Sequence, residues 1–155
     1  MEAGMETAQQ LINQESKIKS VKRTLIDAGP IIALFDSSDQ YHKRVFGFMK
    51  TFEGRLISTW PVLTEVCYML DFSHKAQIDF LDWVIQGGIQ VCNLEQWQIS
   101  RIRHTFETYS DLPADLADVT LIEVAESLSI RSIITLDRDF NVYKLENGNY
   151  LGNLL

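Results

Sequence analysis

The alternation of short apolar runs with longer amphipathic stretches constrains the fold of this chain most. Four runs rich in isoleucine, valine and leucine are bounded by turn residues, and we predict strands at 24–28, 56–59, 89–94 and 132–136. Apolar residues recur with a helical period between them, which predicts helices at 39–53, 60–71, 74–86, 95–109 and 115–129. A fifth, short strand is expected near Tyr150. This order is typical of the α/β class, in which helices cover both faces of a parallel sheet.

The 155 residues have room for one folded domain. Residues 1–22 are polar with weak apolar periodicity, so we expect a loosely ordered extension followed by a single domain over 23–155. No apolar run approaches the roughly 18 residues of a membrane-spanning helix. The N-terminal segment also lacks the apolar core of a signal peptide, so we expect a cytoplasmic protein without membrane contact. Cys67 and Cys92 lack zinc-ligand spacing and are expected to pack in apolar surroundings.

The net charge of −7 argues against a broad basic face for duplex nucleic acid, because such binding neutralises many phosphates with lysine and arginine. The acidic excess lies in the part that is predicted to fold, and two divalent cations would offset four of these charges. The sequence contains neither of the glycine-rich phosphate-binding motifs of α/β proteins, which disfavours a nucleotide-binding domain.

Acidic residues stand where two of the predicted strands end. Asp27 closes the first apolar run and precedes Ala28-Gly29-Pro30, which is predicted to form a turn, and Asp137 follows the fourth strand. Ligands of open parallel sheets bind beyond the carboxyl ends of the strands. These two side chains are therefore candidates for chemistry.

Two predicted helices add further carboxylates. Glu65 falls on the flank of the apolar stripe of helix 60–71, where it faces either the rim of the sheet or solvent. Asp115 and Asp118 are three residues apart at the start of helix 115–129 and project from one side of it. They are either part of a ligand set or acids that stabilise the helix N-terminus through its dipole.

Grouped carboxylates suit metal-dependent chemistry. Several carboxylates within a few ångströms repel and raise each other's pKa values unless cations lie between them. Mg²⁺ and Mn²⁺ prefer such oxygen ligands. Two of these ions can activate a water for attack on a phosphodiester and stabilise the departing 3′ oxygen.

Three segments resemble the motifs of PIN domains. The segment LIDAGPIIALFDSSDQYH is similar to the family's opening, in which an aspartate at the end of the first strand precedes a small-residue turn and an apolar helix. WPVLTEVCYML is similar to the second motif, and LADVTLIEVAESLSIRSIITLDRDF resembles the last two. The resemblance covers about Leu25 to Phe140. It implies a three-layer α/β/α sandwich with a central parallel sheet of four to five strands, and an endoribonuclease that uses Mg²⁺ or Mn²⁺.

Carried over by position, the resemblance implies four catalytic, metal-binding acids, namely Asp27, Glu65, Asp118 and Asp137. Asp115 is a candidate for an additional ligand, but Asp118 fits the family position better because the small residue Ala125 follows seven residues later. Many PIN-domain proteins are VapC-type toxins. The resemblance therefore also implies an RNA substrate, a small antitoxin protein as partner, and a homodimer, which the apolar early helices would permit.

Four further residues are candidates for contact with RNA, namely Thr135, Arg138, His42 and Lys43. The Thr135 hydroxyl either orients Asp137 or a water, or it belongs to an ordinary strand residue. Arg138 contacts a phosphate or forms a surface ion pair. His42 and Lys43 follow the first strand and would reach a phosphate, although the scattered histidines at 42, 74 and 104 also suit surface positions without a catalytic role.

Two other side-chain groups carry structural expectations. The buried stripe of helix 115–129 would leave Glu123 and Glu126 on the solvent-exposed face. The three tryptophans are Trp60, Trp83 and Trp97, and they lie on amphipathic stretches. We expect them in the core or in an interface rather than as platforms on which bases stack.

Two alternative functions are compatible with parts of this pattern. A catalytically weak PIN-fold module that binds RNA or protein would keep the fold, but the presence of all four acids favours catalysis. A phosphotransfer domain with Asp27 as acceptor would need a second aspartate two residues later, where Gly29 stands.

Overall fold

The computed structural model describes residues 21–155, so nearly all of the expected N-terminal extension at 1–22 lies outside the described residues. The described chain forms one five-stranded sheet in the order β3-β2-β1-β4-β5, and every neighbouring pair of strands is parallel. The strands are β1 (Arg23–Ile26), β2 (Arg55–Thr59), β3 (Gln90–Cys92), β4 (Ser132–Ile134) and β5 (Gly152–Asn153). The predicted parallel sheet of the α/β class is confirmed.

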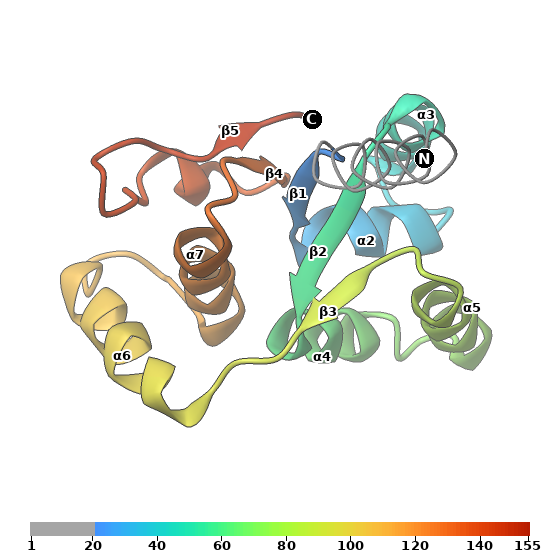
Figure 1. Ribbon diagram of the computed structural model, residues 1–155. Helices are drawn as coiled ribbons and strands as arrows, with labels where there is room; N and C mark the ends of the chain where they lie inside the picture. Colours follow the sequence, from blue (N-terminus) through green and yellow to red (C-terminus); the bar gives the residue numbers. More distant parts are fainter. Residues whose placement is uncertain (1–20) are drawn as a thin grey trace, which may run out of the picture.

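Helices cover both faces of this sheet. Within residues 21–155 they are α2 (Ala28–Phe35), α3 (His42–Thr51), α4 (Trp60–Met69), α5 (His74–Ile85), α6 (Ile99–Thr108) and α7 (Leu116–Leu128), with short 3₁₀ turns η1 (Gln96–Gln98) and η2 (Arg138–Asn141). Figure 1 shows α6 and α7 on one side and α2, α3 and α5 on the other. Helix α4 follows the tip of β2 and contacts both α2 and α7. No helix in the described range is long and apolar enough to cross a bilayer.

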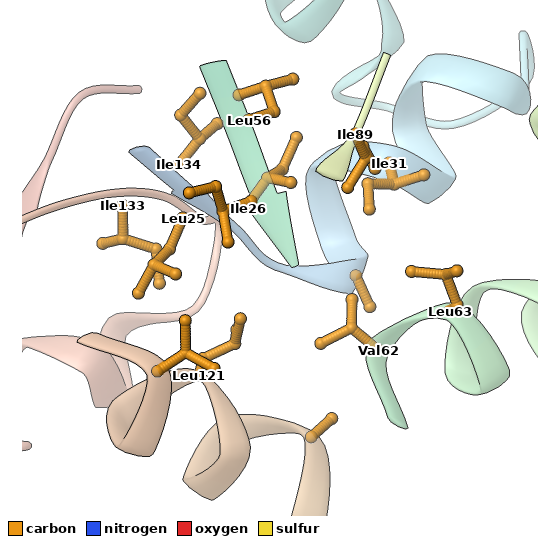
Figure 2. Packing of buried hydrophobic residues seen from close by; sticks show 14 of the residues in the cluster. Leu25, Ile26, Ile31, Leu56, Val62, Leu63, Ile89, Leu121, Ile133 and Ile134 are labelled. Atoms are coloured by element: carbon orange, nitrogen blue, oxygen red, sulfur yellow. The ribbon is translucent and has the colours of Figure 1, made fainter. Parts of the chain in front are cut away.

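The core lies on both sides of the two central strands. β1 and β4 pair Leu25 with Ile133 and Ile26 with Ile134. Because successive side chains of a strand point to opposite faces, each pair adds one residue from each strand to the same face. Figure 2 shows Leu25 and Ile133 pointing towards Leu121 of α7, whereas Ile134 points the other way. This alternation buries apolar side chains against both helical layers.

The sequence prediction for residues 27–30 is wrong. The strand ends at Ile26 rather than at residue 28, and Ala28-Gly29-Pro30 begins α2 instead of forming a turn. Asp27 caps this helix by accepting a hydrogen bond from the Ala28 backbone N–H at 2.7 Å. Proline is tolerated there because N–H groups of a first helical turn have no acceptor within the helix. The other predicted elements are present with ends shifted by a few residues, and β5 begins two residues after Tyr150.

The expectation that Glu123 faces solvent is also wrong, because helix α6 covers the outer face of α7. Arg101 Nε of α6 lies 3.1 Å from Glu123 Oε2, and the Gln98 side-chain amide donates to Glu123 Oε1 at 2.9 Å. Glu126 is half-buried and accepts a hydrogen bond from the Glu146 backbone N–H at 2.5 Å. Helical periodicity cannot show that a second helix covers the polar face.

The expected core positions of cysteine and tryptophan are met in part. Cys67 and Cys92 are free, half-buried and packed against the core. Trp83 also packs there, with its ring centroid 5.5 Å from that of Phe35. Trp60 and Trp97 are exposed and lie outside the core.

Candidate active site

The carboxyl ends of β1 and β4 meet at a topological switch point. From β1 the chain continues through β2 and β3 towards one edge of the sheet, whereas β4 and β5 lie on the other side of β1. Such a switch leaves a crevice where ligands bind. Asp27 follows β1 directly, and its backbone N–H donates to the Ile134 carbonyl at 3.1 Å. Asp137 comes three residues after the end of β4, so both acids lie at the same edge.

The Thr135 hydroxyl connects these two acidic residues. It donates to Asp27 Oδ2 at 2.9 Å and accepts a hydrogen bond from the Asp137 backbone N–H at 2.9 Å. Thr135 is buried, so solvent does not compete for these bonds. Of the two readings of Thr135, this geometry supports orientation of an acid, and the carboxylate that the hydroxyl holds is that of Asp27.

Strand β5 supports Thr135 through the Asn153 side chain, which sequence reasoning missed. The Thr135 backbone N–H donates to Asn153 Oδ1 at 3.2 Å, and Asn153 Nδ2 donates to the Thr135 carbonyl at 3.0 Å. The Asn153 carboxamide thus satisfies both backbone groups of Thr135, as the backbone of a neighbouring strand would. The two residues lie 18 positions apart, and nothing in the sequence indicates this pairing.

Asp115 and Asp118 form a capping box at the start of α7. Asp115 is the N-cap residue, and its Oδ1 accepts from the Asp118 backbone N–H at 2.9 Å. Asp118 Oδ2 accepts from the Asp115 backbone N–H at 3.4 Å. Asp115 is exposed and Asp118 is buried. The helix-capping reading therefore describes Asp115, while Asp118 also places a carboxylate in the interior.

Glu65 reaches the same region from α4. It is half-buried and, with Asp115, lines an open groove of about 700 Å³. Burial raises the pKa of Glu65, and the charges of Asp115, Asp27 and Asp137 add to this effect. Glu65 thus senses the charges of the acids of β1, β4 and α7, which favours the sheet rim over solvent, the two placements that the sequence left open.

The five acids share one electrostatic environment, and we call them the carboxylate cluster: Asp27, Glu65, Asp115, Asp118 and Asp137. Burial raises the pKa of Asp27 from 3.8 to about 6, with Asp137 and Asp115 adding to the rise and hydrogen bonds from Ala28 and Thr135 opposing it. Burial also raises the pKa of Asp118 to about 7, followed by the charges of Asp27 and Asp115. Neighbouring negative charges thus disfavour ionisation of Asp27, Glu65 and Asp118.

Two members of the cluster are buried charges without a basic partner. Asp27 is 7% exposed and Asp118 is 8% exposed, and neither takes part in an ion pair formed within residues 21–155. Glu123 is buried to the same degree but pairs with Arg101. Burying an unpaired charge is costly. Asp27 and Asp118 therefore differ from Glu123, because neither is paired with a basic side chain of the described residues.

The donor atoms fit a hard divalent cation. Among the described residues, no three histidine, cysteine, aspartate or glutamate side chains are grouped closely enough to hold one ion by themselves. Mg²⁺ usually keeps several waters and takes one or two carboxylates, so it does not need such a group. The oxygen-only donors suit Mg²⁺ or Mn²⁺ rather than zinc, which prefers nitrogen and sulfur.

Comparison with known proteins identifies the fold, although no protein-family model matches the sequence. Ribonuclease VapC26 of Mycobacterium tuberculosis (strain ATCC 25618 / H37Rv) is 23% identical over 116 residues, which cover 74% of this chain and 86% of VapC26. The crystal structure of Mycobacterium tuberculosis VapC20, a toxin that cleaves the sarcin–ricin loop, matches with a TM-score of 0.71 at 15% identity. The match covers 77% of this chain and 93% of VapC20. The chain thus has the PIN-like α/β/α fold of VapC20.

A second solved structure has a similar fold. VapBC2 from Rickettsia felis, bound to a DNA fragment from its promoter, matches with a TM-score of 0.53 at 13% identity. The match covers 77% of this chain and 92% of that chain. The fold predicted from the sequence motifs is thereby confirmed.

The remaining candidates for RNA contact lie in two different places in the fold. Arg138 is exposed and follows Asp137 directly, at the start of η2. His42 lies at the opposite end of α2 from Asp27, where its Nδ1 is 2.7 Å from the Ala33 carbonyl oxygen. Lys43 is its exposed neighbour. Arg138 is thus adjacent to the carboxylate cluster, whereas His42 anchors α3 to α2.

Proposed function

We propose that this protein is a divalent-metal-dependent endoribonuclease that hydrolyses RNA phosphodiesters at the carboxylate cluster. The observation that carries the proposal is the pair of buried acids at the switch point of the sheet, Asp27 and Asp118, which have no basic partner within residues 21–155. The relatives support RNA as the substrate class, because VapC26 is a ribonuclease and VapC20 cleaves the sarcin–ricin loop.

Asp27 and Asp118 would hold the cations. Glu65, Asp137 and Asp115 would lie near the bound cations, because they belong to the same group of negative charges. Bound Mg²⁺ or Mn²⁺ would supply an activated water and neutralise charge on the phosphodiester. The Ala28 N–H and the Thr135 hydroxyl each bind one oxygen of Asp27 and so fix the plane of its carboxylate. At neutral pH the raised pKa values make both acids partly protonated, so cation binding would release protons.

Cleavage of RNA tests this proposal directly. The purified protein should cleave total RNA with Mg²⁺ or Mn²⁺ and should lose this activity in EDTA. Asp27→Asn and Asp118→Asn should each lower the cleavage rate by at least about 100-fold, because a metal ligand is lost. Asp82→Asn removes the same charge at an exposed position of α5 and should leave the rate unchanged. Full activity in EDTA would contradict the metal dependence.

Two controls separate loss of chemistry from loss of structure. Each variant should keep the circular dichroism spectrum and cooperative unfolding of the wild type. Glu123→Gln removes a buried acid outside the carboxylate cluster, so it should reduce stability while preserving metal-dependent cleavage. Wild-type protein that binds RNA and Mn²⁺ without cleaving would instead support the catalytically weak PIN-fold module.

We also propose that the protein is the toxin of a VapBC-type pair with a small antitoxin partner. The support is its likeness to VapC20, a toxin, and to VapBC2. Expression alone should arrest growth of a host cell, and expression of Asp27→Asn should not. Co-expression of a small protein from the neighbouring reading frame should relieve the arrest and co-purify with the toxin. Normal growth with active protein would argue against the toxin role.

A homodimer is the assembly that we propose for the free protein. Large apolar side chains are exposed along α4 and at the start of α6 and α7, including Trp60, Met69, Ile99 and Leu116. A group of exposed large apolar side chains on neighbouring elements is typical of protein interfaces. Light scattering should give twice the chain mass, and Met69→Asp should give a monomer. A monomeric wild type at micromolar concentration would refute this assembly.

A further inference from the structure

Tyr143, a buried tyrosine just after η2, has a hydroxyl without a hydrogen-bond partner within residues 21–155. Tyr143 is 1% exposed, and within residues 21–155 its hydroxyl is the buried side-chain polar atom that makes no hydrogen bond. The adjacent Tyr109 differs, since its hydroxyl accepts from the Lys144 backbone N–H at 2.7 Å. Buried polar groups are almost always hydrogen-bonded, and an unsatisfied one costs stability. The Tyr143 hydroxyl therefore requires an explanation.

The ring of Tyr143 is held in place by aromatic contacts. It packs edge to face with Tyr109 at a centroid distance of 5.1 Å and with Phe140 at 5.3 Å. The backbone N–H of Tyr143 donates to the Asp139 carbonyl at 3.4 Å, which ties the residue to the turn after Asp137. The ring is thus packed on both sides next to the segment that carries Asp137.

The surroundings of the phenol are acidic. Burial raises the pKa of Tyr143, and the charges of Asp118, Asp139, Asp137 and Asp115 raise it further, so the phenol remains a protonated donor at neutral pH. These carboxylates are hydrogen-bond acceptors, yet none of them lies within bonding distance of the hydroxyl. The hydroxyl is therefore a donor without an acceptor among residues 21–155, in a region of negative charge.

We propose that the Tyr143 hydroxyl donates a hydrogen bond to an oxygen atom held next to Asp118, either of a water or of a phosphate group. Tyr143 would then be a positioning residue of the carboxylate cluster. This inference rests on the proposed function, because hydrated cations and RNA phosphates bring such oxygens to the cluster. A neutral donor suits this position because it orients an oxygen without competing for the carboxylates, whereas a lysine or arginine would neutralise them.

Cation binding distinguishes this role from a purely structural one. We would titrate Mn²⁺ into wild type, Tyr143→Phe and the matched control Tyr109→Phe, and follow free Mn²⁺ by electron paramagnetic resonance. A second arm would measure the affinity for inorganic phosphate at saturating Mn²⁺. If the oxygen belongs to water, Tyr143→Phe should weaken Mn²⁺ binding by about 10-fold. If it belongs to phosphate, only the phosphate affinity should fall by a similar factor.

The remaining outcomes overturn the inference. Tyr143→Phe should fold and melt at or above the wild-type temperature in EDTA, because it removes an unsatisfied buried group. Unchanged affinities in both arms for that folded variant would mean that the hydroxyl has no role at the cluster. An equal loss in Tyr109→Phe would assign the effect to ring packing. Wild type that binds no Mn²⁺ would overturn both proposals, whereas normal Mn²⁺ binding without RNA cleavage would overturn the proposed function alone.

Discussion

The Asp27→Asn substitution should stabilise the protein in EDTA at neutral pH but not at pH 4. Asp27 is buried, has no basic partner among the described residues, and is close to the charges of Asp137 and Asp115. Asparagine keeps the size of the side chain and removes the charge. Its Oδ1 can still accept from the Ala28 N–H, and its Nδ2 can donate to the Thr135 hydroxyl oxygen. The substitution therefore isolates the cost of the charge.

The magnitude follows from the raised pKa of Asp27. Its carboxyl ionises at about 3.8 in the unfolded chain and at about 6 in the folded protein. Between these values the folded state retains a proton that the unfolded state has released, so wild-type stability falls as pH rises through this window. A displacement of this size corresponds to roughly 3 kcal/mol at 1.36 kcal/mol per pH unit. The gain of Asp27→Asn should thus be near zero below pH 4 and reach roughly 3 kcal/mol above pH 6.

Urea unfolding in EDTA at pH 4 and pH 7.5 would measure this difference. Glu123→Gln is the control, because that acid is buried but paired with Arg101, and its loss should destabilise the protein by about 1 kcal/mol or more at pH 7.5. Excess Mg²⁺ should reverse the order, since a cation stabilises only the variant that still binds it. A gain that is equal at both pH values, or an Asp27→Asn variant less stable than wild type at pH 7.5, would refute the reasoning.

Three further predictions concern the surroundings of the carboxylate cluster. Thr135→Val removes the hydroxyl between Asp27 and Asp137 and should lower the rate of RNA cleavage by about 10-fold to 100-fold. Thr135→Ser keeps a hydroxyl and should retain most of the activity. Equal rates for the two variants would contradict the role of the hydroxyl bridge. Asn153→Ala removes two hydrogen bonds to the Thr135 backbone and should lower the free energy of unfolding, measured in urea titrations, by about 1 to 3 kcal/mol. An unchanged free energy of unfolding would mean that other contacts hold β5 in place. Arg138→Ala should weaken RNA binding and reduce the slope of log affinity against log salt by about 0.7, and an unchanged slope would place Arg138 away from the phosphates.

The site acids at the strand ends follow from local sequence. Asp27 and Asp137 each come after an apolar strand, and parallel strands end at a common edge, so their proximity needs only the order of the elements. Glu65 and Asp118 lie near the starts of helices, on the flanks of the apolar stripes. These positions allow them to face that edge but also suit a solvated or a helix-capping acid. Periodicity and turn residues report these features because each depends on a few neighbouring residues.

Burial and pairing of the individual acids depend on tertiary structure. Asp118 and Glu123 lie on the same helix, and no pattern in the sequence says that Arg101 reaches Glu123 while Asp118 stays without a cation. The difference arises because α6 packs against α7 and brings Arg101 to Glu123, whereas Asp118 lies at the start of α7 and pairs with no basic side chain of the described residues.

The supporting contacts have the same origin. Asn153 reaches Thr135, and Tyr143 packs against Tyr109, only after β5 and the segment following η2 return to the sheet. Hydrophobic periodicity sets which side of each element is apolar, but it carries no information on which distant element packs there. The sequence alone therefore determined the order of strands and helices along the chain, apart from α2, and the edge at which Asp27 and Asp137 lie. Packing between elements decided which acids lack a partner, because only the folded chain brings Arg101, Thr135 and Tyr143 to their neighbours.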